Sequence, residues 1–302
     1  MIDFPSYIKL YEQGLLEDRS QEIGTHASPC MLCPRQCMAN RKDGEKGYCQ
    51  APYDLIVSSA SPHFGEERPL VGTHGSGTIF FTHCNLRCCF CQNYEISIRG
   101  EGIKCAAAHL ADIMLDLQNK GCHNINFVTP SHYTHQIVAA LPLAIEKGLT
   151  IPLVYNTSGY DSLEIIKLLD GVIDIYMPDV KFMDPRLASR YCHAENYPVV
   201  AAEVLREMHR QVGDLVLDDN GIARKGLIIR HLQMPSALDD SKAALDLIAR
   251  ISRNSFVNIM TQYYPCHRAG EFPELTRRIT AGEHDEIIRY ARSLGLERAN
   301  RY

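Results

Sequence analysis

The sequence predicts an α/β fold, a partial barrel of six β/α units that carries a small N-terminal cysteine-rich module. Two observations lead to this class. Six short runs of β-branched, aromatic and other apolar residues recur along the chain, with polar, Gly or Pro residues and helical patterns between them. Strands that alternate with helices pair in parallel through right-handed crossovers. Six such units are too few for a closed eight-stranded barrel, so we expect a partial, TIM-like one.

The elements follow in chain order. The predicted strands are residues 77–83, 124–129, 151–156, 172–178, 226–232 and 256–263. Between the first two strands, Leu110, Ile113, Met114 and Leu117 follow helical spacing, and Gly121 is suited to end that helix. Further helices are predicted over residues 137–148, 161–171, 185–191, 199–213 and 240–252.

Two local signals refine these elements. Asp161 is suited to cap the helix over 161–171, with Glu164 as the matching capping-box residue. Asn220 and Gly221 lie between apolar runs and predict a tight hairpin that leads into the fifth strand.

The N-terminal quarter of the chain lacks this alternation. We therefore predict two domains, a cysteine-rich metal-binding module with its lead-in over 1–74 and a partial barrel over 75–302. In parallel α/β folds, ligands bind at the carboxyl ends of the strands, so the loop after the first strand is expected at the functional face.

Composition limits the class of protein. The 302 residues are 45% hydrophobic, which predicts a sizeable buried core. The net charge is -5 and the 31 basic residues are scattered, so a nucleic-acid partner is not indicated. No apolar run approaches the roughly 20 residues that span a bilayer, and the start MIDFPSYIKLYEQG has no secretory pattern. We predict a soluble, cytoplasmic protein without a membrane partner.

Twelve cysteines without a secretory signal indicate metal binding or catalysis, because the cytosol keeps thiols reduced. Eight of them lie between Cys30 and Cys91. The single cysteines are predicted to be small buried hydrophobic residues, with the one near the end of the sixth strand as the exception to watch. These four are Cys105, Cys122, Cys192 and Cys266.

The stretch HCNLRCCFCQNYEI follows the first predicted strand and provides Cys84, Cys88 and Cys91 at C-x3-C-x2-C spacing. Zinc sites usually have four ligands, and adjacent side chains such as Cys88 and Cys89 rarely reach one ion. Three thiolates suit a 4Fe-4S cubane in which one iron has no protein ligand. An iron of that kind is open to a substrate or cofactor.

This cysteine motif at the end of the first strand of a six-unit partial barrel resembles the signature of the radical S-adenosylmethionine (SAM) superfamily. The run HFGEERPLVGTHGSGTIFFTHCNLRCCFCQNYEIS resembles the branch of uncharacterised iron-sulfur proteins related to pyruvate formate-lyase activating enzyme. The runs NFVTPSHYTHQI, YMPDVKFMDPRLASRY, IIRHLQMPS and VNIMTQYYPCHRAGEFPELTRRIT extend the resemblance to nearly the whole chain.

The resemblance implies an anaerobic oxidoreductase with two cofactors, a 4Fe-4S cluster and SAM. In such enzymes the reduced cluster cleaves SAM into methionine and a 5′-deoxyadenosyl radical, which abstracts hydrogen from a substrate. It also implies a flavodoxin or ferredoxin as reductant and, for the activating enzymes, a glycyl radical enzyme as protein substrate.

The resemblance also indicates candidate contacts to SAM. The family's Gly-Gly-Glu element after the second strand is absent, and Thr129, Ser131 and His132 are the substitutes. A buried structural histidine is the alternative for His132. Asn156 and Ser158 follow the third strand, where a polar turn is the alternative.

Later strand ends add further candidates. Asp179 and Lys181 match the family's Asp-x-Lys, with an ion pair as the alternative. Arg230 is suited to neutralise the SAM carboxylate in a bidentate contact. Gln262, or Tyr263, stands where the family has a histidine after the sixth strand. Phe90 is expected against the adenine, or packed on the cluster loop.

A second cysteine set lies in HASPCMLCPRQCMANRKDGEKGYCQ. Cys30, Cys33, Cys37 and Cys49 suit a closed metal site that holds either zinc or an auxiliary iron-sulfur cluster. The Cys-Pro step resembles ferredoxins, and the glycines of GEKGYC resemble the knuckles of zinc ribbons. Free, packed thiols are the alternative.

Three function classes remain open from the sequence. The first is a radical SAM enzyme that activates a glycyl radical enzyme or modifies a peptide or small molecule. The second is an iron-sulfur electron carrier without SAM chemistry, although a carrier does not need a barrel of this size. The third is a zinc-dependent nucleic-acid module, which the acidic net charge disfavours.

Overall fold

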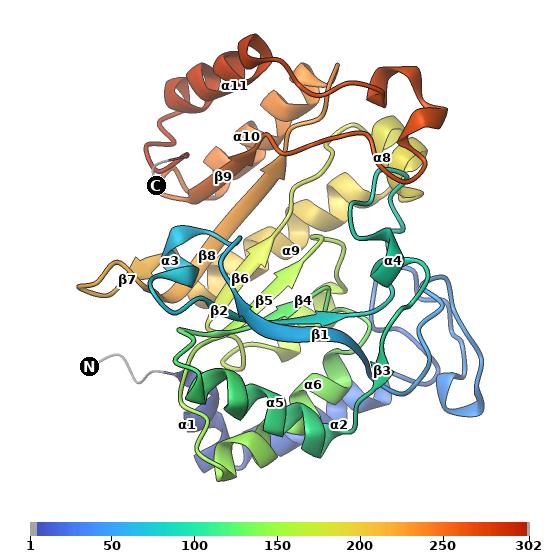
Figure 1. The fold of residues 1–302 in the computed structure, drawn as a ribbon, viewed down its shortest axis with the longest axis vertical. Helices are drawn as coiled ribbons and strands as arrows, with labels where there is room; N and C mark the ends of the chain where they lie inside the picture. The colour runs from blue at the N-terminus through green and yellow to red at the C-terminus, as the bar shows by residue number, and fades with distance from the viewer. Residues whose placement is uncertain (1–4, 301–302) are drawn as a thin grey trace.

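A central open sheet with helices packed around it forms the body of the protein (Figure 1). The structure, a computed structural model, describes residues 5–300. Residues 1–4 lie outside the described residues. They are the start of the stretch MIDFPSYIKLYEQG, in which no secretory pattern was predicted. The predicted mixed α/β class is confirmed.

Six neighbouring strands of the sheet run parallel, and each matches a predicted strand. They are β2 (Ser76–Phe81), β4 (Ile125–Val128), β5 (Leu153–Thr157), β6 (Ile175–Pro178), β8 (Ala223–Leu232) and β9 (Phe256–Met260). They pair in chain order. The register aligns Phe80, Val128, Asn156 and Met177 across the first four, so these strands end at one edge of the sheet.

Helices follow the strands as the apolar spacing predicts. In α5, Leu110, Met114 and Leu117 are buried, and Ile113 is partly buried. The helices of the repeating units are α5 (Ala107–Asn119), α6 (Thr134–Glu146), α7 (Leu163–Leu168), α8 (Pro185–Cys192), α9 (Tyr197–Val212) and α10 (Leu238–Ile251).

The predicted cap of α7 is wrong. The helix begins at Leu163, its N-cap is Ser162, and no side chain caps it. Asp161 instead accepts hydrogen bonds from the hydroxyls of Ser131 and Thr157, each at 2.5 Å. The end of β5 and the loop after β4 therefore supply the partners of Asp161 in place of the helix N-terminus.

The hairpin before the fifth parallel strand is confirmed. Strand β7 (Val216–Leu217) pairs antiparallel with β8, and Gly221 in the turn has φ of 77°. Glycine accepts this left-handed conformation without the steric penalty of a Cβ.

The N-terminal part contains regular elements that the sequence did not predict. Helices α1 (Ser6–Glu12) and α2 (Leu15–Thr25) come first, and strand β1 (Ile56–His63) pairs antiparallel with β2. Short elements complete this region: η1 (Arg41–Asp43), α3 (Arg68–Val71), α4 (Tyr94–Ser97) and β3 (Ile103–Lys104), which pairs with β1. The sheet thus continues across position 74, and a domain boundary there stays a prediction.

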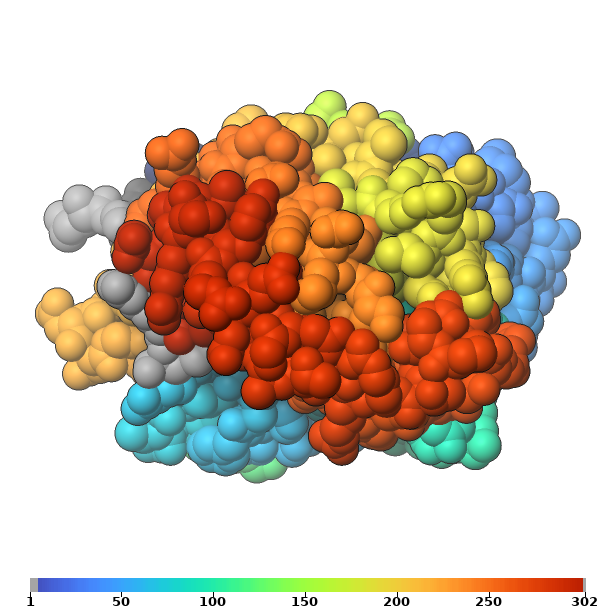
Figure 2. Space-filling view, turned by 90° about the horizontal axis from the view of Figure 1, so that it is seen from above, coloured from blue at the N-terminus to red at the C-terminus, as the bar shows by residue number. Residues whose placement is uncertain are grey.

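A C-terminal segment covers the loop that carries the closely spaced cysteines. After β9 the chain forms η2 (Ala269–Glu271) and η3 (Pro273–Leu275) and then α11 (Ala281–Ser293). The Arg268 amide donates to the Cys89 carbonyl at 2.8 Å, and the His267 ring stacks on Tyr94 at 5.1 Å. In Figure 2 the orange and red C-terminal residues cover much of the face seen from above.

None of the helices in the described part of the chain has the length and apolar character needed to cross a bilayer.

Candidate functional site

A cavity of about 400 Å³ opens at the edge where the parallel strands end. Its lining includes Cys84, Cys88 and Cys91 from the loop after β2. The segment after β1, the loops after β4, β5 and β6 and the ends of β8 and β9 also contribute to the lining. This is the edge at which parallel α/β folds bind ligands, as the sequence predicts.

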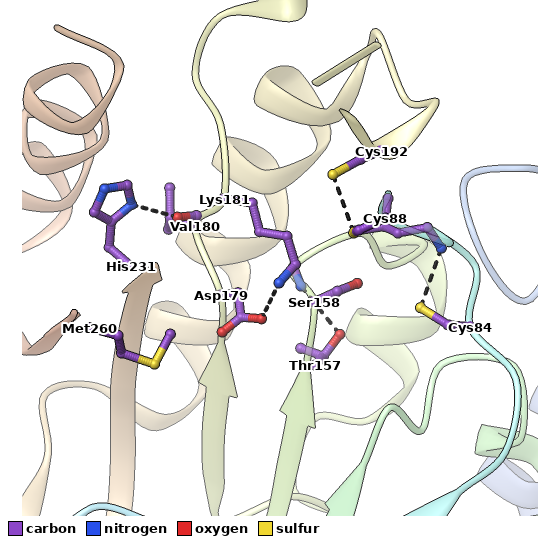
Figure 3. A network of polar contacts seen from close by, with 12 residues as sticks. Cys84, Cys88, Thr157, Ser158, Asp179, Val180, Lys181, Cys192, His231 and Met260 are labelled. Carbon is purple, nitrogen blue, oxygen red and sulfur yellow. Dashed lines mark hydrogen bonds and ion pairs between the residues drawn. The ribbon is translucent and has the colours of Figure 1, made fainter. Parts of the chain in front are cut away.

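Each of the three cysteine sulfurs has a hydrogen-bonding partner. The Leu86 amide donates to Cys84 Sγ at 3.4 Å, and Cys91 Sγ lies 3.1 Å from the Ser97 hydroxyl. The third sulfur, Cys88 Sγ, lies 3.3 Å from the thiol of Cys192 at the end of α8 (Figure 3). Donors aimed at sulfur stabilise thiolates and tune the metal that the thiolates bind.

The same contacts explain the acidity of these thiols. The hydrogen bond from Cys192 lowers the pKa of Cys88, against the opposing effect of burial. Burial raises the pKa of Cys84, and burial together with the charge of Cys88 raises that of Cys91 to about 12. Cys88 is therefore the first of the three to ionise, and metal binding supplies the driving force for the other two.

Cys89 is separate from this set. It does not line the cavity and instead packs in a buried apolar cluster with Phe90, Tyr191 and Tyr263. Burial raises the pKa of its thiol to about 12. Of these two adjacent residues, only Cys88 lines the cavity.

Three residues in the loops at or beside the cavity have a left-handed backbone conformation. His83 and Arg87 in the cysteine loop have φ of 67° and 56°, and Thr129 at the end of β4 has φ of 58°. Non-glycine residues rarely adopt these values, and such strain accumulates at functional sites.

The donor set fits a cubane cluster better than a single ion. Within residues 5–300, no three His, Cys, Asp or Glu side chains converge as the ligands of one metal ion would. In a cubane each cysteine binds a different iron, so the sulfurs share a cavity without converging on one point.

Seven of the predicted SAM contacts line this cavity. They are Thr129, Asn156, Ser158, Asp179, Lys181, Arg230 and Gln262. They come from five different strand ends, and the parallel register brings them together.

Asp179 and Lys181 form an ion pair beside Cys88 (Figure 3). Their charged atoms are 2.6 Å apart, and only 19% and 15% of the two side chains are exposed. Burial would lower the pKa of Lys181, but the charges of Asp179 and Cys88 outweigh it and hold that pKa well above the usual value. Lys181 is thus a permanent cation next to a cysteine sulfur.

Arg230 reaches the cavity with its guanidinium already paired. It bonds to Glu66 and, in a bidentate contact at 2.7 and 2.6 Å, to Glu67. Asn258 on β9 also donates to Glu67, at 2.7 Å. Burial would raise the pKa of Glu67, but Arg230 holds it below the usual value. These acidic partners precede the predicted barrel and were not predicted from the sequence.

Three predicted contacts lie outside the cavity lining. Phe90 is 4% exposed and packs edge-on against Phe182 and Tyr263. Ser131 is bonded to Asp161. His132 is 1% exposed, its Nε2 lies 2.7 Å from the Thr82 carbonyl, and burial lowers its pKa to about 3. All three lie outside the cavity lining in this structure, and their contact with SAM stays a prediction.

Two further residues of the site, Ser97 and Asn258, were not predicted from the sequence. Ser97 belongs to the quoted cysteine run, six residues after Cys91, and a hydroxyl at that distance was a usable signal. Asn258 is the polar residue within the apolar run of the sixth parallel strand. A polar side chain inside such a run marks a position that faces a cavity rather than the core.

The four N-terminal cysteines gather in the irregular segment between α2 and β1. Cys30, Cys33 and Cys49 are buried, and Cys37 is exposed. Of the single cysteines, Cys105, Cys122 and Cys192 are buried as predicted, and Cys266 is partly exposed.

Comparison with known proteins supports the class that the fold and cavity define. Residues 78–218 match the model of the radical SAM superfamily. This range includes the cysteine loop and strands β4 to β6. The chain belongs to this superfamily. The family implies a 4Fe-4S cluster and SAM, and the three cavity cysteines and their donors fit the cluster.

One relative is similar over nearly the whole chain. The Uncharacterized protein MJ0674 of Methanocaldococcus jannaschii is 32% identical over 308 aligned positions, which cover 98% of this chain and 85% of the relative. The resemblance to an uncharacterised branch of the superfamily is thereby confirmed.

Proposed function

We propose that this protein is a radical SAM enzyme whose cluster is held by Cys84, Cys88 and Cys91. When bound, the reduced cluster and SAM supply a 5′-deoxyadenosyl radical that takes a hydrogen atom from the substrate. The observation that carries the proposal is that these three sulfurs line one cavity and each has a hydrogen-bonding partner.

The cavity residues have complementary tasks toward SAM. Asn156, Ser158 and Thr129 offer hydrogen bonds to its hydroxyl and carboxylate groups. The Asp179 carboxylate suits hydroxyl or cationic groups, and the Lys181 ammonium suits an anionic one. A cavity lined by strand ends keeps these groups fixed and limits the access of water. The six parallel strands support the partial (β/α)6 barrel as the scaffold.

The substrate class and the partners extend this proposal. Activation of a glycyl radical enzyme, with a flavodoxin or ferredoxin as reductant, follows from the resemblance to the activating enzymes. A peptide or small-molecule substrate is the second candidate. The C-terminal segment is bonded to the cysteine loop through the Arg268 amide and the Cys89 carbonyl, and this cover beside the cavity favours a smaller substrate.

The test is SAM cleavage by anaerobically reconstituted protein with dithionite. We expect 5′-deoxyadenosine and methionine in equal amounts. Cys84→Ala and Cys91→Ala should abolish both products. Cys89→Ala is the matched control, because this neighbouring thiol lies outside the cavity lining, and it should keep its iron and its product yield within about twofold.

An electron carrier without SAM chemistry gives a different result. Its clusters would be reduced, but SAM would remain intact and its addition would not change the spectrum of the reduced cluster. That outcome would reject the proposed function.

A further inference from the structure

The N-terminal cysteines form a second thiol set with a built environment. Cys30, Cys33 and Cys49 are 4%, 6% and 7% exposed, although the surrounding segment is irregular and largely polar. Cys37 Sγ packs directly over Gly47, where an added Cβ would lie 2.1 Å from the sulfur. Only glycine leaves room for this sulfur, so the segment is shaped around its thiols.

The four thiols are close neighbours. The Met38 amide donates to the Cys30 carbonyl at 3.1 Å, and the Cys30 amide donates to the Ala39 carbonyl at 3.0 Å, so Cys30 lies beside the turn that carries Cys37. Cys37 Sγ in turn lies over Gly47, two residues before Cys49. Arg41, which is 2% exposed, places its guanidinium 4.0 Å from Cys30 Sγ and so favours a negatively charged site.

The arrangement separates zinc from an iron-sulfur cluster. Zinc holds four sulfurs at about 2.3 Å in a tetrahedron, which brings them within roughly 3.8 Å of one another. Among the described residues, these thiols do not converge on one point, and neither do the three cavity cysteines of the radical SAM motif. The two sets share this feature, which favours at the N-terminal cysteines the kind of group expected in the cavity, a cubane whose ligands bind separate irons.

One asparagine lies between the two thiol sets. The Asn85 side chain, fully buried, lies beside the Cys33 thiol, and its Oδ1 is 4.0 Å from Cys84 Sγ. Its Nδ2 donates to the Tyr160 carbonyl at 2.6 Å, which fixes the carboxamide in place. Asn85 thus lies between Cys33 of one set and Cys84 of the other.

Further contacts hold the N-terminal segment against the cysteine loop. Arg35 Nε donates to the Asn85 carbonyl at 3.0 Å, and the Tyr48 hydroxyl donates to the Leu86 carbonyl at 3.3 Å. Arg35 also bonds to the Cys192 and His193 carbonyls, next to the thiol that contacts Cys88. The relative placement of the two sets is therefore fixed by the fold.

We propose that Cys30, Cys33, Cys37 and Cys49 hold a 4Fe-4S cluster that passes electrons to the radical SAM cluster across Asn85. The proposal rests on the proposed function, because it assigns the route by which that reaction receives its electron. A low-potential one-electron carrier, a flavodoxin or ferredoxin, is oxidised by one electron and reduces the N-terminal cluster. That cluster then returns to its oxidised state as the cavity cluster gains the same electron. Zinc has no redox chemistry and would not serve this role.

The first test is the metal content of protein purified without oxygen. In Cys84→Ala/Cys88→Ala/Cys91→Ala, we expect about four irons and four sulfides per chain, bound at the N-terminal cysteines. In Cys33→Ala/Cys49→Ala, we expect the same content, bound at the cavity cysteines. Cys122→Ala, which changes a buried cysteine outside both sets, should keep about eight irons. One zinc in the triple variant, or neither iron nor zinc in a folded triple variant, would overturn the assignment.

The second test separates the relay from a structural role. With reduced flavodoxin as the only donor, formation of the SAM-responsive electron paramagnetic resonance signal should be at least about tenfold slower in Cys33→Ala/Cys49→Ala than in the unmodified protein. With dithionite, a small reductant, the same signal should form in both proteins. Equal rates with flavodoxin, or loss of the signal with both reductants, would overturn the relay.

The two proposals fail in different ways. If the unmodified, fully loaded protein shows no spectral change on addition of SAM, the proposed function is wrong and the relay has no acceptor of that kind. If SAM is cleaved with dithionite but the flavodoxin rate does not depend on the N-terminal cysteines, only the relay is wrong.

Discussion

The thiol of Cys192 lies 3.3 Å from the sulfur of Cys88, and both side chains are buried. Cys192 is the last residue of α8, and Tyr191 precedes it. The backbone amide of Cys89 donates to the Tyr191 carbonyl at 2.9 Å. This bond holds the end of α8 against the cysteine loop. Burial and the charge of Cys88 raise the pKa of Cys192 well above the usual value, so Cys192 stays a protonated donor. Cys192 is a positioning and tuning residue for Cys88.

Replacement of Cys192 is expected to make the cavity cluster harder to reduce. A hydrogen bond to a ligating sulfur stabilises the more negative, reduced state of a cluster. In Cys192→Ala we expect the ratio of reduced to oxidised cluster at a fixed potential to fall about tenfold, or about 59 mV for one electron. Electron paramagnetic resonance during a redox titration measures this shift.

Serine at the same position is the control. The hydroxyl of Cys192→Ser keeps a donor of similar size, so its midpoint should lie close to that of the unmodified protein. A midpoint unchanged in Cys192→Ala, with full iron content, would show that the S–H contact does not act on the cluster.

The second prediction concerns SAM affinity. Asp179→Asn removes the carboxylate that pairs with Lys181 at the cavity wall. We expect SAM to bind at least about tenfold more weakly, because a desolvated charge pair is worth more than a surface pair. Titration of the SAM-induced spectral change measures the affinity, and the iron content should stay unchanged.

Asp112→Asn makes the same chemical change at an exposed ion pair. Asp112 lies 2.6 Å from Lys147 with 63% of its side chain exposed, and this variant should bind SAM normally. Equal SAM affinity of both variants would remove Asp179 from the site.

The sequence predicted the parallel strands and the cavity cysteines because both signals are local. An apolar run of five residues identifies a strand such as β5, and C-x3-C-x2-C spacing identifies the cluster loop without knowledge of the fold. The shared edge of parallel strands then brings Asn156 and Asp179 to one cavity.

The contacts that the sequence did not predict are distant along the chain. Cys192 contacts Cys88 across 104 positions, and Glu67 contacts Arg230 across 163. Spacing along the sequence cannot predict such pairs. The packing of α8 and of the segment after β1 determines which side chains meet. Asp161 illustrates the same limit in part, because a bond from Ser131, 30 positions away, joins one from nearby Thr157 in place of its predicted role as a helix cap.

The third prediction concerns the buried pair of Glu67 and Arg230. The Glu67 side chain is fully buried, so Glu67→Gln leaves the guanidinium without its bidentate partner. We expect the free energy of unfolding to fall by about 3–5 kcal/mol, measured by chemical denaturation without oxygen. Asp116→Asn, at an exposed helical pair with Lys120, should cost less than about 1 kcal/mol. A similar small loss in both variants would show that Arg230 is stabilised mainly by other groups.

The fourth prediction is a pH dependence of stability from His135. This residue on α6 is 5% exposed, and neither ring nitrogen has a hydrogen-bond partner among the described residues. Burial, with a smaller effect of the Arg41 charge, lowers its pKa to about 3. The unfolded chain binds a proton on this residue below about pH 6.5, whereas the folded chain does not until about pH 3. Stability from His135 is therefore present above pH 6.5 and is lost as the pH falls.

Between pH 7.5 and 5.5 this linkage amounts to about 1.4 kcal/mol for one histidine. His135→Phe keeps a ring at the site and removes the titrating group. Between pH 7.5 and 5.5, the free energy of unfolding of this variant should therefore fall by about 1.4 kcal/mol less than that of the unmodified protein. Urea denaturation at the two pH values measures the difference, and the pH-independent effect of repacking against Tyr53 cancels in the comparison. Identical pH dependence in the two proteins would mean that His135 takes up its proton in the folded state, which requires water or an acidic partner to reach the buried ring.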